Sequence, residues 1–133
     1  MPTSTDLVTD LPADFEVFGQ AVDNTVAAYT TKMAFNAQTG TTYTLIAADL
    51  GKLVTASNAS SITVTIPPSV FVAGNMINLQ QIGAGQVTFA QGAGVTITST
   101  GATVSAPKLR AQYSACTIIC TASNAFTVIG DLA

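Results

Sequence analysis

The chain has 133 residues and a formal net charge of −3, it lacks histidine, and only 8% of its residues are charged, against about 25% in an ordinary soluble domain. This length fits one domain, or one domain with an appendage. The few basic residues argue against nucleic-acid binding, which needs Lys and Arg beside the phosphates, and the lack of histidine removes the usual general base and zinc ligand.

The charges divide the chain into two parts. Most of the acidic residues fall in the first 23 positions, whereas residues 41–133 carry only Asp49, Lys52, Lys108, Arg110 and Asp131. A surface this poor in charge is usually covered by copies of itself or by a larger assembly.

Residues 1–36 are expected to form an extended arm followed by a short helix. Pro12 suits the first turn of a helix, where its missing N–H is not needed. Apolar residues then follow at the 4-3-4-3-4 spacing of a coiled-coil seam. The seam consists of Leu11, Phe15, Phe18, Val22, Thr25 and Tyr29. This stripe must be buried, either on the chain's own β module or, as we favour, in a trimerising bundle or a docking helix on a larger particle.

Residues 37–133 are expected to form a β module, with Asn36–Gly40 as the linker that precedes it. Short strands at roughly ten-residue spacing predict an antiparallel β-sandwich or a barrel-like module. The expected strands are 41–46, 52–56, 61–66, 75–82, 86–90, 95–99, 108–122 (one strand or two) and 126–130.

A glycine-containing triplet recurs every nine residues. The copies are Gly83-Ala84-Gly85, Gly92-Ala93-Gly94 and Gly101-Ala102-Thr103. Glycine supplies the positive φ that tight turns require. The triplets are therefore read as successive hairpin turns or, alternatively, as the coils of a small solenoid.

Cys116 and Cys120 lie on one face of a predicted strand. Four residues of extended chain separate them by ~13 Å, whereas a disulfide needs Cα atoms within about 7 Å. Both are expected to be buried free thiols.

Little catalytic chemistry is available in the β module. Its carboxylates are Asp49 and Asp131, far apart in the sequence, and a glycosidase needs two that flank one bond. We therefore expect a non-enzyme without cofactor or metal. No apolar run is long enough for a membrane-spanning helix, and no secretory signal is visible, so the chain is expected to fold in a cytoplasm.

Lys108, Arg110 and Gln112, with Ser114, are expected to share one face of a strand. This face is either a solvated surface or a contact to a neighbouring subunit or an anionic polymer. The aromatic residues of the module, Tyr113 among them, mostly follow a core-like alternation, and no set of residues indicates a glycan site.

Several segments resemble the small β modules of bacteriophage fibre and other virion surface proteins. They are DLGKLV at 49–54, ITVTIPP at 62–68, GAGQVT at 83–88, LRAQYS at 109–114 and VIGDL at 128–132. The resemblance covers about residues 38–133, and LPADF at 11–15 is similar to openings of phage tail-associated proteins. It implies a trimeric, charge-poor β head on the virion, and it assigns no catalytic residue and no receptor site. The chain is too short to include the shaft of a full tail fibre.

Together these features predict a homotrimeric phage structural protein, a fibre-like tail or surface appendage that displays the β module, with host attachment as one role for it. It is expected to assemble in the host cytoplasm and to contact other virion proteins of the tail or capsid. Two alternatives remain: a capsid decoration protein that stabilises the shell, and a lectin-like module that binds host surface polysaccharide.

Overall fold

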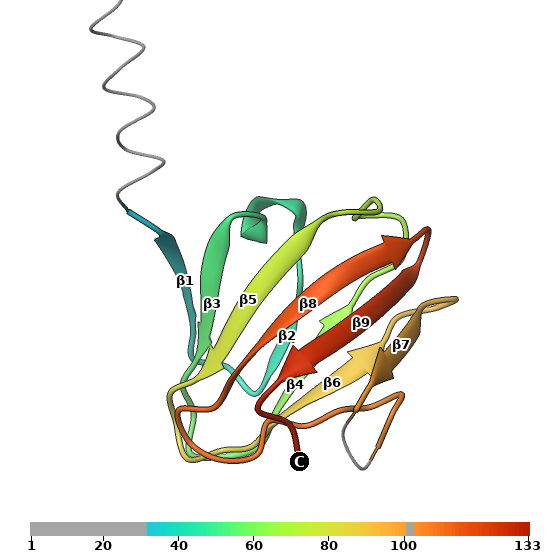
Figure 1. Ribbon diagram of the computed structural model, residues 1–133. Coiled ribbons are helices and arrows are strands. Elements are labelled where there is room, and N and C mark those ends of the chain that lie inside the picture. Colours follow the sequence, from blue (N-terminus) through green and yellow to red (C-terminus); the bar gives the residue numbers. More distant parts are fainter. Residues whose placement is uncertain (1–31, 101–102) are drawn as a thin grey trace, which may run out of the picture. The chain divides into compact units, whose positions relative to one another are not determined.

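The computed structural model describes residues 32–100 and 103–133 (Figure 1). These residues form a mainly β unit that runs from Ala34 to Ala133. No helix among them is long and apolar enough to cross a membrane. The predicted arm, helix and seam, with Leu11, Phe15, Phe18, Val22 and Tyr29, lie outside the described residues.

Nine strands and one short 3-10 helix make up the unit described here. They are β1 Ala34–Gln38, β2 Thr42–Thr44, η1 Ala47–Asp49, β3 Lys52–Ala56, β4 Ile62–Ile66, β5 Met76–Gln81, β6 Val87–Gln91, β7 Thr96–Ser99, β8 Ala115–Ala122 and β9 Ala125–Gly130. The strands form a six-stranded sheet in the order β1-β3-β5-β8-β9-β7 and a three-stranded sheet in the order β2-β4-β6.

The first six strands alternate between the two sheets, and within each sheet they are parallel. β1, β3 and β5 pair in one sheet, and β2, β4 and β6 pair in the other. Each pair of consecutive strands is thus one coil of a β-solenoid. The predicted antiparallel sandwich or barrel is wrong, because the turns send the chain across to the other sheet instead of folding it back beside the strand it has just left.

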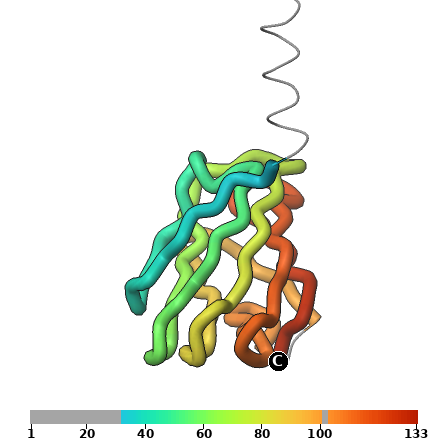
Figure 2. The backbone as a smooth tube through the Cα atoms, turned by 90° about the vertical axis from the view of Figure 1, so that its left-hand side faces the viewer, coloured from blue at the N-terminus to red at the C-terminus, as the bar shows by residue number. Residues whose placement is uncertain are grey.

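Antiparallel pairing appears only after the coils. β8 runs antiparallel to β5 and to β9, with an irregularity between Cys120 and Ala122, and β7 joins the sheet parallel to β9. Figure 2 follows the larger sheet from β1 in blue to β9 in red. The last strands therefore extend the sheet that the coils began.

The core lies between the two sheets and is built by strict alternation. In β4, Ile62, Val64 and Ile66 are buried while Thr63 between them is exposed. Each large apolar side chain buried in this way contributes roughly 1.5–3 kcal/mol. The buried apolar set also includes Val54, Ala56, Ile77, Leu79, Val87, Phe89, Ile97, Ile118 and Val128.

Cys116 and Cys120 both belong to this core. They lie on β8 with their side chains buried, and neither is in a disulfide. The prediction of two buried free thiols is confirmed.

The corner after β5 lies directly on the corner after β3. The N–H of Gly85 donates to the carbonyl of Asn58 at 2.8 Å, and the Asn58 side chain donates to the carbonyl of Thr39, in the preceding coil, at 2.7 Å. A Cβ atom on Gly85 would overlap the carbonyl oxygen of Ser60. Only glycine allows the two backbones to approach this closely.

The glycine triplets are therefore not hairpin turns. Gly83–Gly85 connects β5 to β6 and Gly92–Gly94 connects β6 to β7, and in both cases the two strands lie in different sheets. The solenoid alternative was right about the kind of fold, but each copy is a corner between two strands and not a coil of its own. Gly101 and Ala102 of the third copy lie outside the described residues.

Strand β1 occupies residues that the sequence analysis assigned to the end of the N-terminal helical segment (34–36) and to the linker (36–40), and both assignments are wrong for these residues. Its inward positions are Asn36 and Gln38, and the Gln38 amide donates to the Asn36 oxygen at 2.8 Å. Because its inward positions are polar, this strand lacks the hydrophobic alternation by which strands are predicted from sequence.

Candidate functional site

The segment from Lys108 to Ser114 is a loop with two bridge contacts, not the start of a long strand. Lys108 bridges to Thr88 and Leu109 to Leu132, and β8 begins only at Ala115. The prediction that Lys108, Arg110 and Gln112 line one face of a strand is wrong. The backbone turns at 111–114, where the N–H of Ala111 donates to the Ser114 hydroxyl at 3.1 Å. All three side chains are nevertheless exposed.

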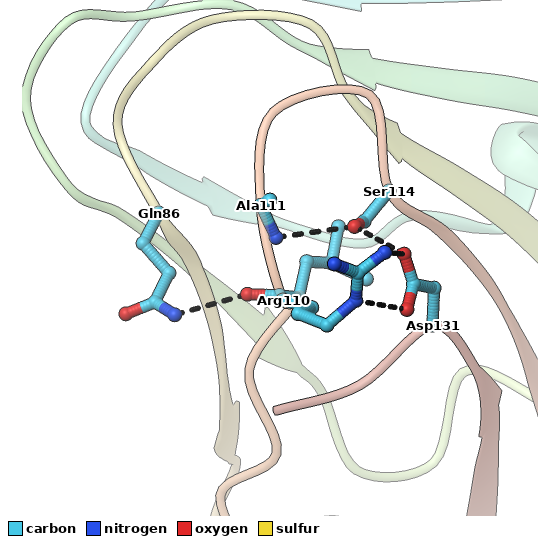
Figure 3. A network of polar contacts seen from close by, with 6 residues as sticks. Gln86, Arg110, Ala111, Ser114 and Asp131 are labelled. Atoms are coloured by element: carbon cyan, nitrogen blue, oxygen red, sulfur yellow. Dashed lines mark hydrogen bonds and ion pairs between the residues drawn. The ribbon is translucent and has the colours of Figure 1, made fainter.

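Arg110 is held by the carboxylate of Asp131 (Figure 3). Its Nε and Nη2 donate to the two carboxylate oxygens at 2.6 and 2.8 Å, and the Ser114 hydroxyl donates to the same carboxylate at 2.6 Å. The hydrogen bonds from Arg110 and Ser114 lower the pKa of Asp131, and the hydrogen bond to Asp131 raises the pKa of Arg110. The network ties the loop to the residues that follow β9.

This pairing limits what the loop can bind. The two-pronged face of a guanidinium is the usual recognition group for carboxylates and phosphates, and in Arg110 it is occupied by Asp131. The Gln112 amide donates to the carbonyl of Ile82 at 2.9 Å. Within the described residues Lys108 makes no ion pair, so its ammonium is the group most available to an external anion.

Tyr113 is the residue of this loop that sequence analysis misplaced. Its side chain is 65% exposed, although a core-like position was expected, whereas Leu109 in the same loop is fully buried. Its φ of 70° is unusual for a bulky residue. The backbone is fixed there because Tyr113 N–H donates to the carbonyl of Gln81 at 2.7 Å, while the Gln80 amide donates to the Tyr113 carbonyl at 3.2 Å. No pattern in the sequence signals this conformation.

Asp49 is a buried carboxylate in the first coil. It accepts hydrogen bonds from the Asn36 amide at 2.7 Å, the Tyr43 hydroxyl at 2.9 Å and the backbone N–H of Ile46 at 2.9 Å. These donors come from β1, from β2 and from the residue before η1, so one side chain ties three segments together. Burial, together with the hydrogen bond to Asp49, raises the pKa of Tyr43.

The two carboxylates of the β module belong to separate networks. Asp49 is bound by Asn36, Tyr43 and the Ile46 N–H, and Asp131 by Arg110 and Ser114, with no shared partner. The structure does not bring them together as an acid–base pair.

The remaining reactive side chains offer little chemistry. Residues 32–100 and 103–133 contain no group of three or more His, Cys, Asp or Glu that could hold a metal ion. Burial raises the pKa of the Cys116 thiol to about 12 and also raises the pKa of Cys120. At neutral pH both thiols are protonated and therefore poor nucleophiles.

The outer face of the six-stranded sheet is broad and uncharged. One row crosses five strands in register and consists of Phe35, Leu53, Asn78, Thr117 and Ile129. The one charged residue within these six described strands is Lys52, which alternates with buried Val54 and so falls on the inner side. Phe35 is 70% exposed, Met76 55% and Ile129 45%.

The outer face of the three-stranded sheet has a different composition. Thr42, Thr63 and Thr88 are paired in register across β2, β4 and β6, and Thr44 pairs with Thr65 beside them. Hydroxyl groups therefore cover this face. The two sheets of one unit thus present one hydroxyl-rich face and one face with large exposed apolar side chains.

A scan of the sequence against protein-family models gave no match, and a search of the curated proteins found no significantly similar sequence.

Proposed function

We propose that this protein is a structural component of a bacteriophage virion, in which the segment before β1 docks or trimerises and the β module is displayed as a compact tail or surface appendage. The observation that carries the proposal is the uncharged outer face of the six-stranded sheet, on a module that already has a complete core of its own. A face with large exposed apolar side chains is typical of a protein that works inside an assembly. The resemblance of residues 38–133 to virion β modules supplies the kind of assembly.

The assembled state is a homotrimer held in part by the seam Leu11, Phe15, Phe18, Val22 and Tyr29. Asp at positions 15 and 18 would place two carboxylates in a buried apolar stripe, which is strongly unfavourable. The variant Phe15→Asp/Phe18→Asp should lose the trimer while its β module keeps the circular dichroism of the native protein. A trimer of unchanged mass in sedimentation equilibrium would contradict this role of the seam.

The virion assignment is tested on purified particles of a phage that encodes the chain. Mass spectrometry should detect the protein in the particles, and labelled antibodies against the β module should mark the tail or the capsid in electron micrographs. Label on the tail supports the appendage, whereas label on the capsid supports the decoration alternative. Absence of the chain from purified particles overturns the proposal.

Receptor binding is a second candidate, favoured by the exposed ring of Tyr113 in the loop that also carries the exposed side chains of Arg110 and Gln112. Exposed aromatic rings next to amide and cationic groups suit a polysaccharide contact. Saturable binding to host surface polysaccharide, weakened in Tyr113→Ala and unaffected by a chelator, would support it. Release of new reducing ends would instead show a hydrolase and overturn the non-enzymatic assignment.

A further inference from the structure

We propose that the outer face of the six-stranded sheet is the surface through which the β modules of neighbouring copies pack against one another. The inference rests on the proposed trimer and names the part of the β module that forms it. The occupant of the face is a second copy of this chain.

The chemistry of the face fits a self-contact. The row Phe35, Leu53, Asn78, Thr117 and Ile129, with Met76 and Ile119 beside it, combines apolar side chains with uncharged polar ones. Two copies of a charged surface would repel each other, but two copies of this one leave no charge unpaired. A sheet face that stays in water normally carries polar side chains, and exposed fractions of 70% for Phe35 and 55% for Met76 depart from that rule.

The other sheet of the same unit provides an internal comparison. Its outward positions are mainly threonines, and no large apolar side chain stands among them. Phe35, Met76 and Ile129 are therefore specific to one face and do not simply reflect the apolar composition of the chain.

The connection before this face is short. β1, which carries Phe35, is the edge strand of the sheet, and the predicted seam ends at Tyr29, shortly before β1 begins at Ala34. In a trimer held by that seam, the β modules of the three copies would be tethered to one another, and each would have a second copy available as a partner.

The size of the face shows that it works together with the seam. Strands spaced ~4.8 Å apart and about five residues long give six strands a flat area of roughly 400 Å². A stable contact buries about 800 Å² on each partner. The face supplies about half of this area, so both the face and the seam are needed for a stable trimer.

The test places a charge at the centre of the face. Thr117 lies on β8 between Asn78 and Ile129, whereas Thr63 is the matched position on β4, the central strand of the threonine-covered sheet. Full-length native protein, Thr117→Arg and Thr63→Arg are compared by analytical ultracentrifugation over a range of concentrations, with circular dichroism to verify folding. Thr117→Arg should raise the dissociation constant about a hundredfold or more, since it buries an unpaired charge. Thr63→Arg should assemble like the native chain.

The outcomes separate this inference from the proposed function. A native trimer that Thr117→Arg leaves unchanged overturns the interface but not the trimer. A native chain that stays monomeric at all concentrations overturns the trimer and the interface with it.

A milder variant covers the case in which Thr117→Arg does not fold. Thr117→Cys and Thr63→Cys are nearly isosteric changes, and the native thiols are buried, so maleimide labelling reports the new thiol. Cys at 117 should be labelled slowly in the trimer and rapidly after dilution, and Cys at 63 rapidly in both. Rapid labelling at 117 in the trimer overturns the interface. Slow labelling at 117 both in the trimer and after dilution shows that another part of the same chain covers the face. That result overturns the proposal that a second copy covers it.

Discussion

Replacing Asp49 with Asn tests whether the buried carboxylate organises the first coil. The carboxylate has only acceptor oxygens, and three donors converge on it: the Asn36 amide, the Tyr43 hydroxyl and the Ile46 N–H. An Asn at this position keeps one acceptor oxygen but turns an NH₂ group toward the remaining donors. The Tyr43 hydroxyl can rotate and accept, whereas an amide or backbone N–H cannot.

The expected cost follows from these contacts. A hydrogen bond to a charged group contributes about 1.5–3 kcal/mol, and a buried donor left without an acceptor costs about 1–3 kcal/mol. The substitution makes the remaining hydrogen bonds neutral and leaves one donor opposed to the new NH₂ group, without an acceptor. The removal of a buried charge offsets part of this loss. We expect a net loss of about 2–4 kcal/mol in the free energy of unfolding, a large fraction of the stability of a small domain.

Urea unfolding at fixed protein concentration measures this change. With a slope near 1.5 kcal/mol per molar, the loss lowers the midpoint by roughly 1–3 M. Asp131→Asn is the matched control, since that carboxylate also accepts three hydrogen bonds but its side chain is 40% exposed. Its midpoint should move far less, because water replaces the lost partners. Equal shifts for the two variants would refute the reasoning that burial makes Asp49 important.

Three further predictions concern the corner, the thiols and the phenol. Gly85→Ala should lower the free energy of unfolding, measured in thermal or urea unfolding, by about 3 kcal/mol or more, because its Cβ overlaps the Ser60 carbonyl. Gly94→Ala has open space around the new Cβ and a φ of 74°, so it should lower the free energy of unfolding by only about 1–2 kcal/mol. A larger loss for Gly94→Ala than for Gly85→Ala would contradict the close packing of the two corners. Maleimide should label Cys116 and Cys120 slowly in the native protein at pH 7 and rapidly in urea, without an intrachain disulfide in the mass spectrum. The pKa of Tyr43 is raised in the folded protein, so its contribution to stability is complete below its unfolded pKa of about 10 and is lost as the pH rises through the folded value. Tyr43→Phe should therefore flatten the fall in stability above pH 10.

The sequence located most of the strands because their alternation is strong. Ile62, Val64 and Ile66 predict β4 to within one residue, and β3 was predicted with its observed bounds. Alternation shows which face of a strand is buried, but it does not show which strand lies beside it. Parallel pairing was missed because the partner of Ile62 is Val87, one full coil later, and no local pattern records that distance.

The polar features of the fold were harder to predict than its core. β1 was missed because its inward positions are Asn36 and Gln38, whose side chains form hydrogen bonds with other polar side chains. The Arg110–Asp131 pair joins residues far apart in the sequence, and Tyr113 adopts a backbone conformation that its residue type disfavours. The exposure of Lys108, Arg110 and Gln112 was foreseeable, but the engagement of Arg110 by Asp131 depends on the tertiary fold.

The position of β9 in the larger sheet affects the order in which the chain can fold. β9 lies between β8 and β7, so β7 has no neighbour in its own sheet until residues 125–130 are in place. During synthesis the parallel coils of β1 to β6 can stack as they leave the ribosome, since each contacts the coil just before it. The backbone of residues 96–99 stays unpaired in its sheet until about thirty further residues have been synthesised. Completion of β9 is thus the step that closes the sheet, and a pause in translation before it would leave an exposed edge prone to pairing with other chains.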